Sequence, residues 1–304
     1  MKIYVAGHRG LVGSAIVRQI EKSGLHSWVG RTRQELNLFD GKQVEEFLRD
    51  EKPDAIILAA AKVGGIGANS NFPVEFLTEN LRIELNIMES AHNQNIDRLV
   101  FLGSSCIYPK FTKQPIQESQ LLTGSLEFTN EPYALAKIAG LKLAASYRLQ
   151  YGRDWVSAMP CNIYGPGDNF DLASGHVLPV LMQRFHNAKI AGDSHVTLWG
   201  DGTPLREFLH SDDLASAILY ILDNYHEEEH VNVGSGFEVS IQELARLVSQ
   251  VVGFKGEILW DETKPNGTPR KVLETSKLER LGWSSKIDLS DGILATYQSE
   301  FLSN

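Results

Sequence analysis

The sequence predicts an α/β protein with a doubly wound parallel sheet and a smaller α/β domain towards its C-terminal side. Short apolar runs alternate with amphipathic stretches through the first half of the 304 residues. A glycine-rich turn follows the first apolar run, and loops rich in Gly, Asp, Asn and Pro become frequent after about residue 166. Alternating strands and helices favour βαβ units with helices on both faces of one sheet.

Four apolar runs are predicted as buried strands because they are rich in Val, Ile, Leu and Ala without polar alternation. They lie at 2–7, 55–61, 98–105 and 155–162. Amphipathic stretches between them predict helices at 13–24, 41–53 and 74–95. The first of these helices ends on Gly24 as a C-cap would, and the second closes before Pro53.

The bulk composition argues against a nucleic-acid or membrane binder. The chain carries 29 Lys plus Arg against 38 Asp plus Glu, a formal net charge of −9. Such a surface repels nucleic acid and acidic membranes, so an anionic ligand must be bound in a local basic pocket. Two cysteines form no disulfide framework, and the first residues enter a strand directly. We expect a cytoplasmic protein and predict no metal site.

A glycine turn links the first predicted strand to its helix. Gly7, Gly10 and Gly13 follow a G-x-x-G-x-x-G spacing, which differs from the simplest dinucleotide fingerprint but shares its physics. Glycine permits a tight turn and a close backbone approach to a pyrophosphate, which rests on the helix N-terminus. The sequence therefore predicts a Rossmann-like cofactor site, with a tight turn without ligand as the plainer alternative.

Three arginines favour NADP(H) as the cofactor. Arg31 and Arg33 stand in "SWVGRTRQELNL", the region between the first helix and 41–53 where the second strand of an NAD site usually ends in an acid, and Arg9 lies inside the glycine turn. A guanidinium group matches a phosphate with two hydrogen bonds. At least one of the three is expected to be surface charge only.

The predicted division of the chain follows from these elements. Residues 1–167 form the cofactor domain, to which 208–235 returns, and residues 168–207 with 236–304 form the substrate domain. The second half predicts helices at 177–188, 213–224 and 240–253 and strands at 196–200, 230–236 and 257–260.

A tyrosine and a lysine stand one helical turn apart in "EPYALAKIAG". Tyr133 and Lys137 share one face of a helix, and a neighbouring ammonium stabilises a phenolate. Ser104 ends an earlier strand. Together with the glycine turn, these residues resemble the extended short-chain dehydrogenase/reductase superfamily, as do "ELNLFD" and "LAAAKVGG". The resemblance also implies cofactor contacts from Leu38, Lys137, Asn162 and His176.

Residues 105 and 106 separate the chain from the dehydratases of this superfamily. Dehydratases carry Asp-Glu after the serine or threonine, whereas Ser105 and Cys106 stand here. With "YGPGDNFDLASGHVLP", "WGDGTPLREFLH" and "KPNGTPRK", "GSSCIYP" is similar to the motifs of the GDP-4-keto-6-deoxy-D-mannose epimerase/reductases. That resemblance covers essentially the whole chain and implies an NADPH-dependent enzyme that forms GDP-L-fucose.

The resemblance implies a role for each residue near the sugar. Cys106 is the base and His176 the acid of two epimerisations, at carbons 3 and 5 beside a ketone, since a thiol and an imidazole titrate near neutral pH. Ser104 and Tyr133 bind the developing oxyanion, and Tyr133 protonates it during reduction. Contacts to the GDP-sugar are expected from Arg184, Trp199, Arg206 and Glu274, with Arg270 and Lys271 as helpers.

Several alternatives remain open from the sequence. A nucleotide-sugar 4-epimerase or a simple 4-ketoreductase is possible on the same scaffold, and so, remotely, is a non-catalytic NADP-binding sensor. Cys161 is expected to be a buried small hydrophobe, and His195, His226 and His230 are expected to be structural. By resemblance we expect a homodimer through helices at 75–93 and 133–150, although an ordinary core face has the same apolar spacing.

Overall fold

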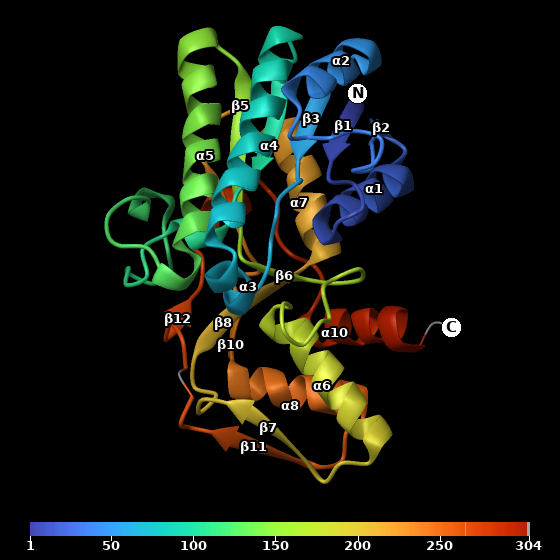
Figure 1. Cartoon of the computed structure of the whole chain (residues 1–304), viewed down its shortest axis with the longest axis vertical. Coiled ribbons are helices and arrows are strands. Elements are labelled where there is room, and N and C mark those ends of the chain that lie inside the picture. The colour runs from blue at the N-terminus through green and yellow to red at the C-terminus, as the bar shows by residue number, and fades with distance from the viewer. Residues whose placement is uncertain (265, 303–304) are drawn as a thin grey trace.

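A computed structural model describes residues 1–264 and 266–302, so Pro265 of the "KPNGTPRK" motif lies outside the described residues. One six-stranded sheet, in the order β2-β1-β3-β4-β5-β9, organises the upper part of the molecule (Figure 1). Every neighbouring pair in it is parallel. The prediction of a doubly wound parallel sheet is therefore confirmed.

The strands of this sheet correspond to the predicted apolar runs. Because both faces are covered by helices, β3 and β4 are buried along their whole length. The strands are β1 (Lys2–Ala6), β2 (Ser27–Val29), β3 (Ala55–Leu58), β4 (Arg98–Leu102), β5 (Asp154–Pro160) and β9 (Val231–Val233).

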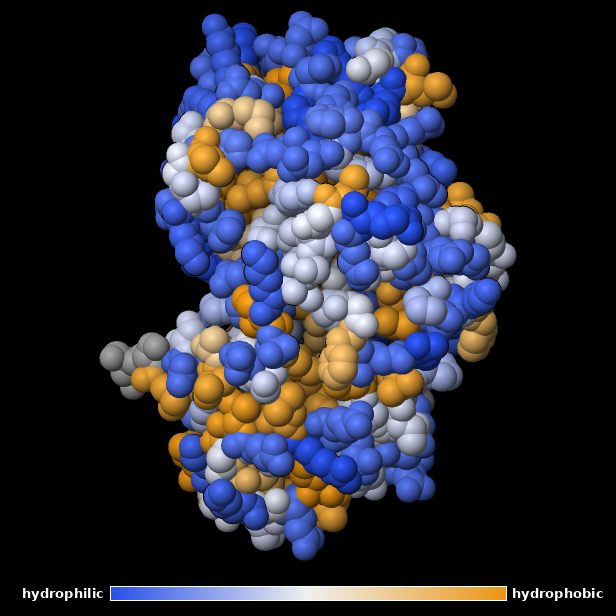
Figure 2. Space-filling model, turned by 180° about the vertical axis from the view of Figure 1, so that it is seen from behind, coloured by the Kyte–Doolittle hydropathy of each residue, from blue (hydrophilic) through white to orange (hydrophobic). Residues whose placement is uncertain are grey.

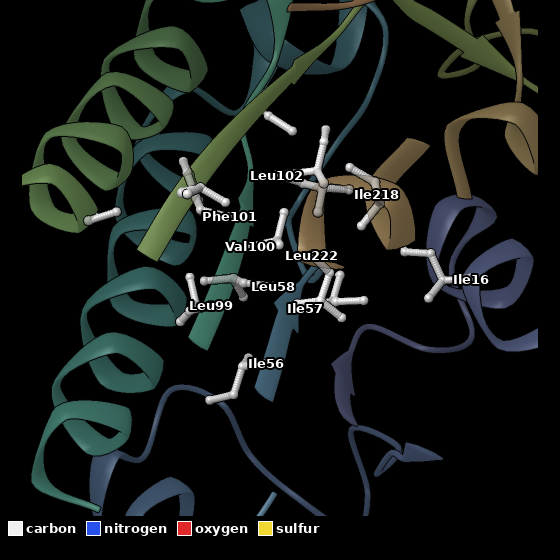
Figure 3. Close-up of a cluster of buried hydrophobic side chains, with 14 of the residues drawn as sticks. Ile16, Ile56, Ile57, Leu58, Leu99, Val100, Phe101, Leu102, Ile218 and Leu222 are labelled. Atoms are coloured by element: carbon white, nitrogen blue, oxygen red, sulfur yellow. The ribbon is translucent and has the colours of Figure 1, made fainter. Parts of the chain in front are cut away.

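Two groups of helices cover the sheet. The long helices α4 (Pro73–Asn93) and α5 (Glu131–Tyr151) pack together with α2 (Gly41–Glu51), and α1 (Leu11–Ser23) packs against α7 (Ser211–Asn224). Gly24 ends α1 in the left-handed conformation, as predicted, with φ of 63°. Figure 3 shows apolar side chains on both faces of the sheet: Leu58 and Phe101 lie on the side of α4 and α5, and Ile57 lies on the opposite side with Ile218 of α7, in a core that is closed to water.

The lower part of the molecule has its own core around three helices, α6 (Val177–Ala191), α8 (Ile241–Val252) and α10 (Leu289–Tyr297) (Figure 1). Its strands form a small mixed sheet and a two-stranded parallel pair. They are β6 (Asn162–Tyr164), β7 (His195–Trp199), β8 (Leu205–His210), β10 (Glu238–Ser240), β11 (Glu257–Asp261) and β12 (Arg270–Lys271). Although α7 and β9 lie between β8 and β10 in sequence, they belong to the upper layer.

The remaining elements are short. They are α3 (Ile66–Asn71), α9 (Ser276–Arg280), the 3₁₀ turns η1 (Ser105–Ile107), η2 (Glu118–Gln120) and η3 (Phe128–Asn130), and the terminal π-helical turn η4 (Gln298–Leu302). Seen from behind, apolar surface gathers mainly on the lower part of the molecule (Figure 2). No helix among the described residues combines the length and the apolar character that crossing a membrane requires.

Candidate active site

The glycine turn is shaped by contacts that exclude side chains. Gly7 has φ of +86°, and a Cβ on it would lie 2.8 Å from the backbone of Ala60. A Cβ on Gly13 would lie 2.1 Å from the carbonyl oxygen of Gly7. The Gly10 N–H donates to that same oxygen at 2.9 Å. Gly7 and Gly13 must be glycine because a Cβ at either position would collide with neighbouring backbone atoms.

The start of α1 fits a bound diphosphate. Gly10 caps the helix without a side-chain hydrogen bond, and the first turn contains no acidic residue. Its first N–H groups therefore keep their capacity for an anion. The turn follows β1, at the place where the strand order reverses between β1 and β3. Ligands of open α/β sheets bind at such switch points.

The three arginines near this turn differ in their surroundings. Arg31 pairs with Glu51 and lies 5.2 Å from the ring centre of Phe47, so it serves the structure. Arg9 and Arg33 are exposed and make no ion pair among the described residues. These two remain the predicted contacts for a cofactor phosphate.

Leu38 and Asn162, two further predicted cofactor residues, make contacts within the protein. Leu38 packs on the core while its carbonyl accepts from Asn86 at 2.8 Å. The Asn162 amide donates to the Glu207 carbonyl at 2.7 Å. Their cofactor contacts stay predictions.

Ser104, Tyr133 and Lys137 come together at the end of β4. Tyr133 hydrogen-bonds Ser104, which acts to lower its pKa, while burial and the nearby Cys106 raise that pKa more strongly. The Lys137 side chain is only 2 % exposed, and its Nζ donates to the Leu102 carbonyl at 3.0 Å. β4 ends here because the chain turns into η1, which Ser104 caps.

The Cys106 thiol faces two hydrogen-bond donors. Asn130 Nδ2 lies 3.3 Å from Sγ and Lys271 Nζ lies 3.5 Å from it. A sulfur that has lost its proton would therefore face an ammonium group. Asn130 was not predicted as a site residue. Its position at the end of η3, three residues before Tyr133, was the feature of the sequence that could have indicated it. Lys271 was predicted only as an additional contact for the GDP-sugar.

His176 caps α6, on a loop that reaches back to the upper layer. The Gly65 N–H donates to the Ser174 carbonyl at 2.9 Å, and a Cβ on Gly65 would lie 2.7 Å from the Gly175 oxygen. This contact holds the loop against the segment after β3. The pKa of His176 is lowered, first by its dense surroundings and then by the charge of Lys271, although its side-chain surface is open to solvent.

Arg206 lies on β8 beside β12, where Lys271 is its register partner. Burial lowers the pKa of its guanidinium, and no carboxylate pairs with it in the part of the chain that the structure describes. Its Nη1 donates to the Leu205 carbonyl at 2.8 Å. Its charge is therefore not used in an internal salt bridge among the described residues.

The other three predicted substrate residues differ in their exposure and in their contacts within the protein. Trp199 is 65 % exposed, with Lys264 Nζ 5.8 Å from its ring centre. Arg184 makes a long contact, 3.5 Å, to the Thr197 carbonyl. Glu274 instead accepts from the backbone N–H and the hydroxyl of Ser276, both at 2.9 Å.

An ion pair and two hydrogen bonds from backbone N–H groups hold β12 beside the site. Arg270 pairs with Glu238 through two hydrogen bonds of 2.8 Å, so its charge is balanced within the protein. Glu207, fully buried, accepts from the Leu273 N–H at 2.9 Å and the Gly236 N–H at 2.8 Å. These bonds hold the strand that carries Lys271.

The residues predicted to be structural have structural partners. Cys161 is buried, and burial raises its pKa. His230 bonds the Tyr108 hydroxyl at 3.0 Å, and burial lowers its pKa to about 4. His226 bonds Asp154 at 2.6 Å, and His195 bonds the Ser194 hydroxyl at 3.2 Å.

The parallel sheet, the glycine turn and the serine–tyrosine–lysine arrangement define a nucleotide-dependent enzyme of the extended short-chain dehydrogenase/reductase class. The family model described as the NAD dependent epimerase/dehydratase family matches residues 3–234, and the chain belongs to that family.

Individual similar proteins give a more specific comparison than the family model does. The chain is 57 % identical to GDP-L-fucose synthase 1 of Arabidopsis thaliana, over 97 % of this chain and 92 % of that one. A GDP-L-fucose synthetase from Naegleria fowleri, solved with NADP bound, has a TM-score of 0.91 and 29 % identity, covering 99 % of this chain and 94 % of that one. A GDP-mannoheptose C4 reductase from Campylobacter jejuni, also with NADP, has a TM-score of 0.90 and 36 % identity, covering 98 % and 97 %.

Proposed function

We propose that this protein converts GDP-4-keto-6-deoxy-D-mannose to GDP-L-fucose by 3,5-epimerisation and NADPH-dependent 4-reduction. The observation that carries the proposal is the Cys106 thiol, which is flanked by Asn130 and Lys271 beside the Ser104–Tyr133–Lys137 arrangement. A hydride-transfer site needs no thiol, whereas proton removal beside a ketone needs a base. One site is thus both isomerase and oxidoreductase.

NADP(H) fits the upper layer. Gly7, Gly10 and Gly13 would hold the diphosphate at the start of α1, and Arg9 and Arg33 would hold the ribose phosphate. The cofactor supplies hydride to carbon 4 when bound. Lys137, with one N–H directed at Leu102, has an N–H donor for a ribose hydroxyl.

Epimerisation follows from the ketone at carbon 4. Protons on carbons 3 and 5 are acidic because the carbanion delocalises onto the ketone oxygen as an enolate. Ser104 and Tyr133 donate hydrogen bonds to that oxygen. Cys106 removes the proton from one face and His176 supplies one to the other.

Reduction uses the same oxygen. After both centres are inverted, carbon 4 receives hydride and Tyr133 gives its proton to the oxygen. The resulting phenolate lies near the buried ammonium of Lys137, whose Nζ is 6.0 Å from the ring centre.

The lower part of the molecule would bind the GDP portion. Arg206 is the leading candidate because its charge has no carboxylate partner among the described residues. Arg184 and Trp199 would contact the nucleotide from α6 and β7, and Glu274 would contact the sugar. We therefore propose that residues 168–207 and 236–304 form the substrate domain.

A homodimer through α4 and α5 is part of the proposal. Leu85, Leu135 and Leu149 are exposed apolar residues on these helices, a pattern suited to a four-helix interface. Sedimentation of the wild-type protein and of Leu85→Arg tests it, and a monomeric wild type would reject it. A cytoplasmic setting is proposed from the two free thiols.

The decisive experiment mixes the protein with GDP-4-keto-6-deoxymannose and NADPH in heavy water. Cofactor oxidation with deuterium at carbons 3 and 5 supports the proposal. Oxidation without deuterium there would instead identify a simple 4-ketoreductase, the activity named for the Campylobacter neighbour. Neither NADPH oxidation nor deuterium at carbons 3 and 5 would favour a 4-epimerase, which needs a hydroxyl on carbon 4 of its substrate and consumes no cofactor in net.

A further inference from the structure

A carboxylate lies where an apolar side chain would be expected. The inward face of α4 contains Phe76, Ile83, Ile87 and Met88, and Glu84 lies on the same face. Glu84 is 1 % exposed. Burying a carboxylate is costly unless it is paired, so its partner determines its purpose.

That partner is the lysine of the active site. Glu84 Oε1 lies 3.2 Å from Lys137 Nζ. Neither carboxylate oxygen has another hydrogen-bond partner among the described residues. Burial raises the pKa of Glu84, and the charge of Lys137 opposes that shift. The carboxylate is therefore compensated by Lys137 alone.

The neighbouring helix makes room for this pair. A Cβ on Gly140 would lie 2.6 Å from Glu84 Oε2 and 2.6 Å from the Phe101 ring. Gly140 follows Lys137 by three residues and so lies on the same face of α5. Any larger residue at position 140 would displace the carboxylate from the lysine.

Three groups together hold the ammonium. Lys137 Nζ contacts Glu84, donates to the Leu102 carbonyl at 3.0 Å and lies 4.8 Å from the centre of the Phe101 ring. An ammonium has three N–H donors, so one remains beyond the two oxygen contacts. The position of Nζ is thereby set before any ligand binds.

We propose that Glu84 is a positioning residue for the reduction, which holds Lys137 as an ammonium at the end of β4, one helical turn from Tyr133. This inference rests on the proposed function. Glu84 acts through Lys137. Without the carboxylate, the buried ammonium would have no counter-charge in the protein, and the Tyr133 phenolate would no longer have a cation held in place beside it.

Few other titratable groups act on the Glu84–Lys137 pair and on Tyr133. Tyr133 lies on α5, and Cys106 of η1 acts on Tyr133. β4 contributes the uncharged Phe101 ring and Leu102 carbonyl. Glu84 itself also acts to raise the pKa of Tyr133, so its benefit depends on the charge and position of Lys137.

The pH dependence of NADPH oxidation tests this role. In Glu84→Gln, the alkaline limb of the profile should move to lower pH by about one unit or more, with a roughly tenfold loss of rate at pH ~8.5. Glu89→Gln, an exposed glutamate on the same helix, should match the wild type. A uniform loss at every pH, with an unmoved limb, would overturn the positioning role.

A folding cycle tests the pair without substrate or turnover. Lys137→Met should lower the melting temperature more than the double variant Glu84→Gln/Lys137→Met, because the single change leaves a buried carboxylate unpaired. A double variant that melts no higher than Lys137→Met would overturn the inference, and this comparison does not require Glu84→Gln alone to fold. A wild-type protein that never oxidises NADPH with this substrate would instead reject the proposed function.

Discussion

Lys137 is a buried cation and Arg206 a half-buried one, and they differ in whether the protein supplies their counter-charge. Lys137, between α4 and α5, has the carboxylate of Glu84 at 3.2 Å. Arg206, on β8, has no carboxylate partner among the described residues, and burial lowers its pKa. A cation that is paired internally belongs to the scaffold. A half-buried cation that is left unpaired is a site for an external anion, because a ligand can restore its lost solvation.

The largest effect is expected at Cys106, which lies between these two regions. Cys106→Ser keeps the shape but removes the base, so deuterium exchange at carbons 3 and 5 should fall roughly a thousandfold. Mass spectrometry of the sugar in heavy water measures this. Cys161→Ser is the matched control and should leave exchange intact. Exchange at the wild-type rate in Cys106→Ser would assign the base to another residue.

The paired cation should be needed for folding. Lys137→Met leaves Glu84 buried without a partner and should cost about 3–5 kcal/mol of unfolding free energy. Urea denaturation measures this loss. A loss below about 1 kcal/mol would mean that the carboxylate is neutral in the native protein and that the contrast with Arg206 is wrong.

The unpaired cation should be needed for substrate instead. Arg206→Met removes charge-assisted hydrogen bonds to a diphosphate and should raise the KM for the GDP-sugar about a hundredfold. NADPH affinity, measured by fluorescence titration, should stay unchanged, and unfolding free energy should not fall. Equal damage to both ligands would make Arg206 structural.

A smaller effect is expected where Lys271 faces His176. The charge of Lys271 lowers the pKa of His176, after burial, so Lys271→Met should raise that pKa. His176 then holds its proton to higher pH, and NMR titration of the imidazole should show the midpoint moving upward. Lys264→Met, which removes a cation beside Trp199, should leave the His176 midpoint in place.

The local elements were predictable because their signals are local. The apolar runs without alternation predicted β1, β3, β4 and β5, and Gly24 predicted the end of α1. The sequence did not indicate that β6 pairs with β8 outside the six-stranded sheet, because that pairing joins Asn162 to Phe208. A strand of three residues such as β6 is too short to show a periodic pattern of apolar residues in the sequence.

The site was predictable only in part, for the same reason. Ser104, Cys106, Tyr133 and Lys137 stand in motifs whose neighbours along the chain identify them. Asn130 and the new role of Lys271 have no such motif, because they meet Cys106 across 24 and 165 residues of sequence.

The sequence by itself determined which chemical groups are present and the strand–helix order that brings the glycine turn and the serine, tyrosine and lysine to one sheet edge. Only the tertiary structure decided which charges are paired, Lys137 with Glu84, and which are not, Arg206. Pairing depends on distance and on the water that packing removes, and neither quantity is written in the order of the residues.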